Sequence, residues 1–249
     1  MSIKAVTELT VLENLPCGRN QSMLVLQGEH DLLPVKPGQF VNVEIPDNKE
    51  VFLRRPFSVF RVDEERRLLT LLVKDLGKGS HSLIQVGTGR KLNIIYPLGN
   101  GFTFPVPGDR PLAVGGGSGV APLLFLASLA ASAGIKMDVL LGARSAADHI
   151  PVNTVAEDIR CFFTTEDGSL GASGLVTDHP VMKQLDSYNR IYTCGPLPMM
   201  KAVAALAKTK GVTCEVSLEN LMACGFGVCL CCIEPTVEGN QCVCTQGPV

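Results

Sequence analysis

Cysteine spacing at the C-terminal end of this 249-residue chain limits how that end can fold. Four cysteines stand in the order C-x4-C-x2-C-x11-C: Cys224, Cys229, Cys232 and Cys244. Gly225 and Gly227 separate the first two. Glycine most easily supplies a positive φ and a close backbone approach, which a short loop needs if it wraps a bound group. The segment therefore predicts a loop built around metal held by thiolates.

The spacing of the first three cysteines is the one that holds a [2Fe–2S] cluster in plant-type ferredoxins, where a fourth thiolate comes from further along the chain. Structural zinc is the main alternative, although its four thiolates usually arrive as two C-x2-C pairs. A disulfide framework is disfavoured, because the first residues lack the apolar stretch of a signal peptide. Cys231 and Cys242 are surplus thiols that offer alternative registers. The pattern favours iron and sulfide, with zinc left open.

Composition excludes several classes of function. The formal net charge of −2 argues against nucleic acid or an anionic membrane as a partner. The absence of Trp and the presence of 3 Tyr disfavour a platform for stacked bases. The apolar runs are too short to span a bilayer, and 10 cysteines without a secretion signal indicate a reducing compartment. We therefore expect a cytoplasmic protein.

The first hundred residues predict an antiparallel β-barrel. Short apolar runs alternate with turn sequences, and they lie at residues 22–27, 40–45, 56–62, 68–74 and 91–96. Beyond Pro105, short apolar strands alternate with helical stretches, which predicts a doubly wound parallel sheet. Its strands are expected at 111–115, 137–141, 160–164 and 189–193, with helices ending near residues 133 and 210. A last strand is expected at 213–217.

The chain is therefore expected to hold three domains. These are a β-barrel over residues 1–104, an α/β domain over 105–212 and a small cluster-binding domain over 213–249.

Two glycine turns follow strands of the predicted parallel sheet. The string Gly-Gly-Gly-Ser-Gly covers residues 115–119, and Cys194-Gly195-Pro196 follows a later strand. A turn that opens a helix can hold a pyrophosphate through backbone amides and the helix dipole. The first string lacks the full G-x-G-x-x-G spacing, so a tight turn without a ligand is the alternative. Because open α/β sheets bind ligands beyond the carboxyl ends of their strands, the two turns predict one nucleotide crevice.

In the barrel, Arg54 and Arg55 precede a strand, and a Gly-Lys-Gly-Ser turn follows another at residues 77–80. A pair of solvated cations at a strand edge is the simplest interpretation of the first string. The alternative is a diphosphate fork with Ser58 as an extra donor. In the second string, Ser80 is a candidate N-cap for a helix over residues 80–84.

Together these strings resemble the ferredoxin-reductase superfamily, which binds a flavin with R-x-[FY]-[ST] and G-x-G-[ST] strings. In that superfamily, G-G-G-x-G-x-A-P-L and C-G-P strings bind a nicotinamide nucleotide. Within it, the chain most resembles the electron-transfer subunits of dihydroorotate dehydrogenase B. It shares with them Leu-Arg-Arg-Pro-Phe-Ser from residue 53, Met-Ala-Cys-Gly from residue 222 and the closing Cys-x-x-Gly-Pro-Val.

The resemblance implies FAD, a [2Fe–2S] cluster and NAD as electron acceptor. FAD would lie on Arg55, Pro56, Phe57, Ser58, Leu72, Val73, Lys74, Gly79 and Ser80. NAD would bind Gly115, Gly116, Gly117, Gly119, Cys194, Gly195 and Pro196. The four cysteines of the opening pattern would ligate the cluster. No acid–base residue is expected to be catalytic, because hydride transfer needs none and the four histidines are scattered.

The resemblance also implies a partner, an FMN-containing dihydroorotate dehydrogenase catalytic subunit, with two copies of each subunit. Electrons would pass from FMN through the cluster and FAD to NAD+, in pyrimidine biosynthesis. One alternative is an NAD(P)H–ferredoxin or sulfide dehydrogenase reductase subunit, where related chains carry Asp in place of Cys224. Another is a non-catalytic zinc-stapled or redox-sensing module. NADH or NADPH is left open by Arg144, which suits a 2′-phosphate, and Asp148, which suits a free ribose.

Overall fold

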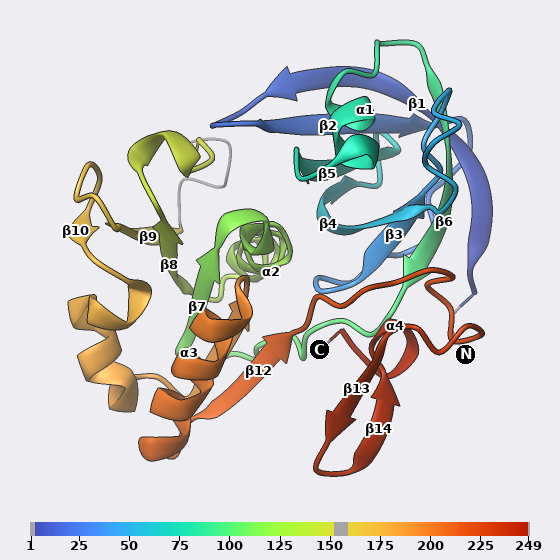
Figure 1. Cartoon of the computed structure of the whole chain (residues 1–249). Coiled ribbons are helices and arrows are strands. Elements are labelled where there is room, and N and C mark those ends of the chain that lie inside the picture. Colours follow the sequence, from blue (N-terminus) through green and yellow to red (C-terminus); the bar gives the residue numbers. More distant parts are fainter. Residues whose placement is uncertain (1–2, 152–158, 249) are drawn as a thin grey trace. The chain divides into compact units, whose positions relative to one another are not determined.

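A computed structural model describes residues 3–151 and 159–248 of the chain. Backbone contacts divide the chain into two compact units, which we describe separately. The first unit holds Met1–Gly101 together with Glu219–Val249, and the second holds Phe102–Leu218. The cysteine segment at the C-terminal end therefore belongs to the same unit as the N-terminal strands (Figure 1).

The first unit contains a closed antiparallel barrel with the strand order β1-β2-β5-β4-β3-β6. Its elements are β1 (Ala5–Pro16), β2 (Gln21–Gly28), β3 (Phe40–Val43), β4 (Arg55–Asp63), β5 (Leu68–Lys74), α1 (Lys78–Ile84) and β6 (Lys91–Leu98). The interior is lined by fully buried aliphatic side chains such as Leu24, Leu69 and Ile94. Closure gives every strand of this barrel a paired neighbour on each side along at least part of its length. The predicted barrel is confirmed.

The first barrel strand, β1, is missing from the sequence prediction. Its apolar signal is weak, because Leu9 and Val11 are its buried side chains while most of the others are half-buried or exposed. The alternation of polar and apolar residues around Leu9 is nevertheless the period-2 pattern of a half-buried strand. β1 pairs with β2 and with β6, so it closes the barrel.

The second unit contains a 6-stranded sheet in the order β10-β9-β8-β7-β11-β12, with every neighbouring pair parallel. Its strands are β7 (Pro111–Gly116), β8 (Asp138–Ala143), β9 (Arg160–Thr165), β10 (Ala172–Ser173), β11 (Arg190–Cys194) and β12 (Thr213–Ser217). The helix α2 (Val120–Ser132) follows β7, and α3 (Leu197–Thr209) follows β11. The predicted parallel sheet is confirmed, and β10 adds one short strand to it.

Strand order in this sheet reverses between β7 and β11, since the chain runs outward from β7 through β8 and from β11 through β12. Such a reversal is the point where open α/β sheets bind ligands. One face of the sheet is covered by α3 and by short 3₁₀ segments, whose Val203, Val181 and Leu185 pack on Leu112 and Ile191.

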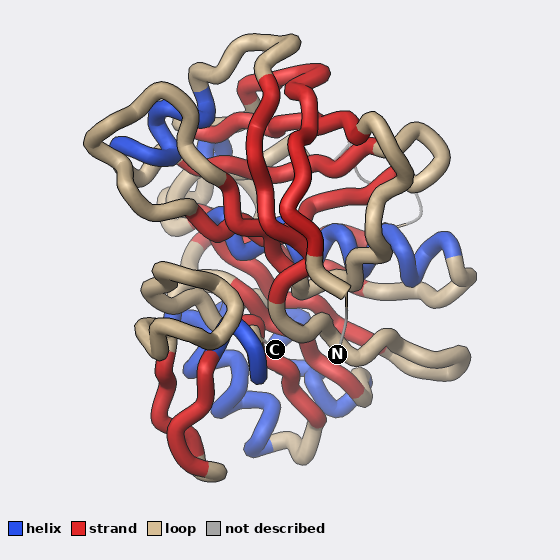
Figure 2. The backbone as a smooth tube through the Cα atoms, turned by 90° about the vertical axis from the view of Figure 1, so that its right-hand side faces the viewer, coloured by secondary structure: helices blue, strands red, loops and turns tan. Residues whose placement is uncertain are grey.

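The cysteine segment of the first unit is a loop followed by a small hairpin. The hairpin consists of β13 (Ile233–Thr236) and β14 (Gly239–Cys242), and the one-turn helix α4 (Val243–Gln246) follows it. Figure 2 shows the hairpin as a separate pair of strands at the lower left of the view. Strand β12 pairs with β11 in the parallel sheet. The three-domain division with its boundaries stays a prediction.

None of the helices in the described part of the chain has the length and hydrophobicity of a membrane-spanning helix.

Candidate functional site

The hairpin β13–β14 brings the third and fourth predicted cluster ligands together. Cys232 precedes β13 and Cys244 follows β14, and the Val243 amide donates to the Cys232 carbonyl at 3.1 Å. The Cys244 amide donates to Cys232 Sγ at 3.4 Å. Both side chains are buried, and burial together with the Cys232 thiol raises the pKa of Cys244 to about 12. The long C-x11-C step therefore corresponds to one hairpin closed at its base.

The first two predicted ligands lie in the tight loop before the hairpin. Gly225 and Gly227 have φ of 81° and 88°, as predicted from their place between the cysteines. The Cys229 amide donates to Cys224 Sγ at 3.4 Å. Burial alone would raise the pKa of Cys224, but backbone N–H groups of Cys229 and Phe226 lower it to about 6. A sulfur surrounded by amide donors is suited to the thiolate form that binds metal.

The surplus thiols differ in their surroundings. Cys231 is exposed, and its amide donates to Cys229 Sγ at 3.5 Å. Desolvation and the neighbouring Cys232 raise the pKa of Cys242. Within residues 3–151 and 159–248, no group of three or more His, Cys, Asp or Glu side chains is arranged around a single metal ion. The predicted ligands instead lie in two thiol pairs, in each of which the amide of one cysteine donates to the sulfur of the other: Cys224 with Cys229 and Cys232 with Cys244.

The predicted flavin residues lie where two barrel strands separate. β4 and β5 pair between Val59↔Leu71 and Asp63↔Leu68. Beyond Val59, residues 55–58 pair with β3, and residues 72–74 pair with β2. In this described part of the barrel, the facing edges of residues 55–58 and 72–74 therefore carry unpaired backbone groups. Such groups need partners, and the polar edge of a flavin ring supplies both donors and acceptors. The residues fit a flavin.

The two adjacent arginines have different surroundings. The guanidinium of Arg54 donates to Glu44 Oε2 at 2.7 Å and to Asn93 Oδ1 at 2.6 Å. Arg55 instead lies over the Gly-Lys-Gly-Ser turn, and a Cβ added to Gly79 would meet its Cγ and Nε at 3.1 Å. Arg54 therefore braces the barrel, while Arg55 lies beside the turn predicted to bind phosphate.

The hydroxyl of Ser80 organises that turn. Its Oγ accepts from the amides of Leu76 at 2.8 Å and Gly77 at 3.1 Å, and it donates to the Gly77 carbonyl at 3.0 Å. The helix α1 begins at Lys78, two residues before the predicted start. Ser80 is therefore the third residue of the helix, and its prediction as N-cap is wrong.

The two glycine turns of the parallel sheet touch one another. A Cβ added to Gly119 would lie 2.5 Å from the Gly195 amide nitrogen and 2.6 Å from the Cys194 carbonyl carbon. Gly195 has φ of 145°, and a Cβ there would lie 2.7 Å from the Gly116 carbonyl oxygen. Both turns stand at the carboxyl ends of β7 and β11, where strand order reverses. The structure brings the predicted nucleotide residues of the two turns together.

Beside these turns, the segment after β8 holds the two residues that bear on nucleotide choice. Asp148 is half-buried, and its Oδ2 accepts from Ser145 Oγ at 2.8 Å. Arg144 is exposed. The carboxylate is therefore held in place on the segment that follows β8.

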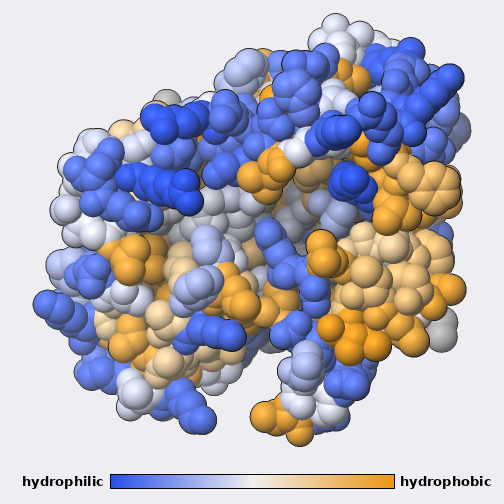
Figure 3. Space-filling model, in the orientation of Figure 1, coloured by the Kyte–Doolittle hydropathy of each residue, from blue (hydrophilic) through white to orange (hydrophobic). Residues whose placement is uncertain are grey.

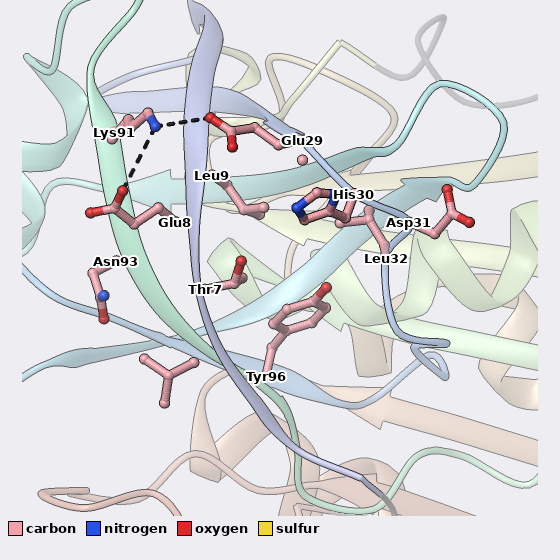
Figure 4. A pocket seen from close by; sticks show the side chains of 12 residues that line it. Thr7, Glu8, Leu9, Glu29, His30, Asp31, Leu32, Lys91, Asn93 and Tyr96 are labelled. Carbon is pink, nitrogen blue, oxygen red and sulfur yellow. Dashed lines mark hydrogen bonds and ion pairs between the residues drawn. The ribbon is translucent and has the colours of Figure 1, made fainter.

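Two hollows lie away from the predicted site residues. One, of about 410 Å³, lies on the barrel wall between β1, β6 and the loop after β2, where Lys91 lies 2.9 Å from Glu29 and 3.8 Å from Glu8 (Figure 4). The other, of about 780 Å³, lies at the amino ends of β7 and β8 and includes Asp138. Neither hollow is lined by a residue that the sequence predicted to bind a cofactor or metal. The second hollow is at the opposite end of the parallel sheet from the glycine turns.

Sequence reasoning missed two asparagines that tie the cysteine segment to the barrel. Asn42 of β3 donates from Nδ2 to the Cys224 carbonyl at 3.1 Å. Asn100, after β6, donates from Nδ2 to the Gln246 carbonyl at 3.0 Å. The available signal was Asn42 itself, a polar residue between Val41 and Val43 in an apolar strand.

A family model described as the iron–sulfur cluster binding domain of dihydroorotate dehydrogenase B matches residues 219–249. The chain is also similar to curated proteins over nearly its full length. One is the dihydroorotate dehydrogenase B (NAD(+)) electron transfer subunit of Shouchella clausii, 34% identical over 247 residues, which are 97% of this chain and 94% of that protein. The subunit of the same name from Fusobacterium nucleatum is 34% identical over 253 residues, covering 98% of this chain and 96% of that protein.

Solved structures share the architecture. The chain matches a structure of an NADH-dependent reduced ferredoxin–NADP oxidoreductase with a TM-score of 0.85 and 27% identity, covering 98% of this chain and 88% of the other. The ferredoxin reductase of carbazole 1,9a-dioxygenase matches with a TM-score of 0.75 at 20% identity, covering 86% of this chain and 69% of that one. The fold is thus that of ferredoxin reductases, and the predicted resemblance is confirmed.

Proposed function

Because this chain belongs to the family of dihydroorotate dehydrogenase B electron-transfer subunits, we propose that it delivers electrons from dihydroorotate oxidation in a partner subunit to NAD+ during pyrimidine biosynthesis. The observation that carries the proposal is the similarity over nearly the whole chain, which includes the matched cysteine segment. When bound, a flavin exchanges hydride with a nicotinamide and single electrons with an iron–sulfur cluster. The chain's own residues bind and position these groups.

The iron–sulfur group is proposed to be a [2Fe–2S] cluster. Such a cluster needs two thiolates for each of two irons. The two thiol pairs, Cys224 with Cys229 and Cys232 with Cys244, supply that number in that grouping. Amide donors at Cys224 Sγ and Cys232 Sγ also stabilise the reduced, more negative form of a cluster, because they place positive dipoles at sulfur.

FAD is proposed as the flavin, on the separated edges of β4 and β5. Arg55, Pro56, Phe57 and Ser58 would provide one edge, and Leu72, Val73 and Lys74 the other. The Arg55 guanidinium and the turn at Gly79 and Ser80 would hold the diphosphate. The support is that Arg55 lies against Gly79, while the neighbouring Arg54 is engaged by Glu44 and Asn93.

NAD+ is proposed to bind across the two touching glycine turns. The residues are Gly115, Gly116, Gly117, Gly119, Cys194, Gly195 and Pro196. Without side chains at these glycines, backbone amides can approach a pyrophosphate closely, and the start of α2 adds the positive end of its dipole. Asp148 supports NADH over NADPH, since a carboxylate accepts from ribose hydroxyls and repels a 2′-phosphate.

The partner is proposed to be an FMN-containing catalytic subunit, with two copies of each chain in the complex. Support comes from exposed apolar side chains within the cysteine loop. Phe226, Val228 and Leu230 are 41%, 74% and 56% exposed. Figure 3 shows hydrophobic surface on the right-hand side, in the region where Figure 1 draws the loop before β13. Apolar surface beside a redox centre is the kind of surface that a permanent subunit covers.

Anaerobic affinity purification of the full chain from its own host tests the proposal. We expect an FMN-containing partner to co-purify, and the complex to reduce NAD+ when dihydroorotate is added. A complex that holds flavin and iron but ignores dihydroorotate while reducing ferredoxin would refute the proposed substrate and favour the ferredoxin-linked alternative. One zinc per chain in place of iron and sulfide would refute the cofactor assignment.

A further inference from the structure

Asn42 is a buried amide in an apolar strand of the barrel. Its side chain is 1% exposed, and its neighbours Val41 and Val43 are fully buried. A buried amide costs free energy unless its donors and acceptors find partners, so its retention in a strand interior calls for a specific contact.

That contact is with the cysteine loop, 182 residues further along the chain. Asn42 Nδ2 donates to the carbonyl of Cys224 at 3.1 Å. The side chain also packs against the next residue, since a Cβ added to Gly225 would lie 2.9 Å from Asn42 Nδ2. Among the described residues, Asn42 Oδ1 is buried and has no hydrogen-bond partner. In the described part of the chain, the side-chain amide of Asn42 therefore hydrogen-bonds to the cysteine loop and not to another barrel strand.

The backbone of the same residue lies beside the proposed flavin strand. In the β3–β4 ladder, Asn42 pairs with Pro56, and Val41 and Val43 pair with Phe57 and Arg55. Asn42 thus joins the strand assigned to FAD with the loop that carries the first cluster ligand. Among the described contacts, it is a direct link of one residue between these two parts of the barrel unit.

The other end of the cysteine segment is also tied to the barrel. The Asn100 amide donates to the Gly247 carbonyl at 2.5 Å, and Asn100 Nδ2 donates to the Gln246 carbonyl at 3.0 Å. These carbonyls follow Cys244, the last predicted ligand. With Asn42 at the first ligand, the barrel holds the segment at both ends.

We propose that Asn42 is a positioning residue, which fixes the Cys224 end of the cluster loop against the flavin strand and so sets how tightly the cluster is held and its reduction potential. The inference rests on the proposed cluster. Its physical basis is that groups just beyond the metal ligands orient them and control the access of water. Loss of the amide donor frees the Cys224–Gly225 peptide and lets water reach the first ligand.

The test compares Asn42→Leu with Asn14→Leu in the full chain, purified anaerobically. Leu has the same number of side-chain heavy atoms as Asn and the same branch at Cγ, but it is bulkier and lacks the donor. Asn14 is the control for losing a side-chain amide of the same unit: it is half-buried, and its Nδ2 donates to the carbonyls of Ile84 and Val86, away from the cysteine segment. The measurements are iron and sulfide content, the rate of iron loss to a chelator, the midpoint potential of the cluster, and flavin content. Asn42→Ala serves if the leucine variant does not fold.

Groups beyond the ligands typically change metal affinity by about 10- to 100-fold. We therefore expect Asn42→Leu to lose iron about 10- to 100-fold faster than the unmodified chain and to shift the midpoint potential of the cluster. Asn14→Leu should lower the unfolding temperature and leave both cluster properties unchanged. If Asn42→Leu lowers only the unfolding temperature, as the control does, the positioning role is refuted while the cluster remains. If the unmodified chain holds no iron and sulfide, the proposed function itself fails.

Discussion

Replacement of Gly119 by Ala tests whether the two touching glycine turns form the nucleotide site. Gly119 has φ −64° and ψ −8°, so alanine meets no backbone penalty there. The added Cβ would lie 2.5–2.6 Å from backbone atoms of Cys194 and Gly195. Because carbon contacts settle near 3.5–4.0 Å, the turns must separate by about 1 Å. Overpacking of this kind costs about 1–3 kcal/mol.

If the whole of this free energy is lost from nucleotide binding, the affinity for NADH should drop by about 5- to 150-fold. The assay is a calorimetric titration in which NADH is added to the purified chain under anaerobic conditions. Flavin and iron contents should stay unchanged, since the residues proposed to bind them belong to the other compact unit.

Gly87→Ala is the control, because its added Cβ meets no atom within 4 Å and its φ lies outside the left-handed region. Unchanged NADH affinity in Gly119→Ala, together with a lowered unfolding temperature, would refute the assignment. The turns would then be close-packed without binding the nucleotide.

Four further outcomes are expected. Arg55→Ala should weaken FAD binding by roughly 1.5–3 kcal/mol, measured by flavin fluorescence, whereas Arg54→Ala should keep FAD; equal retention in both would exclude the phosphate role. Cys229→Ser should lose iron and acid-labile sulfide while FAD stays bound, and unchanged metal content would remove Cys229 from the ligand set. Asp148→Asn should narrow the preference for NADH over NADPH several-fold in paired titrations; an unchanged ratio would show that this carboxylate does not read the ribose. Burial lowers the pKa of His149 below its ordinary value of 6.5, so this residue stabilises the fold above pH 6.5 and stops doing so as pH falls through its lower folded pKa. The free energy of unfolding of His149→Gln should therefore fall less between pH 7.5 and 5 than that of the unmodified chain. Parallel curves of unfolding free energy against pH would contradict this.

Local patterns predicted the elements of this fold well, because burial on one side of a strand or helix leaves a periodic trace in the sequence. The strand over residues 68–74 is predicted with its observed bounds, since both ends carry turn residues and its interior is apolar. β1 was not predicted, because its buried side chains are those of Leu9 and Val11, which are too few to make a clear apolar run. The start of α1 was misplaced because the Ser80 hydroxyl bonds back to Gly77, a choice between two local arrangements that composition does not decide.

The candidate site was predictable where chemistry is local and hidden where it is not. The cysteine order is a local pattern, so the ligand set could be proposed without a fold. The grouping of those cysteines depends on a hairpin, β13–β14, whose exposed polar strands leave little periodic signal.

The contacts that hold the cysteine segment to the barrel carry still less sequence signal. Asn42 and Cys224 are 182 residues apart, and the local sequence around either residue does not predict its contact with the other. A buried asparagine between two valines nevertheless marks a place where a strand must meet a polar group from elsewhere, because an amide left unpaired there would cost more than an apolar side chain of the same size. Such residues locate long-range contacts, although they do not identify the partner. In this chain the partner is a proposed cluster ligand, which is why the amide links the two proposed redox groups of one compact unit.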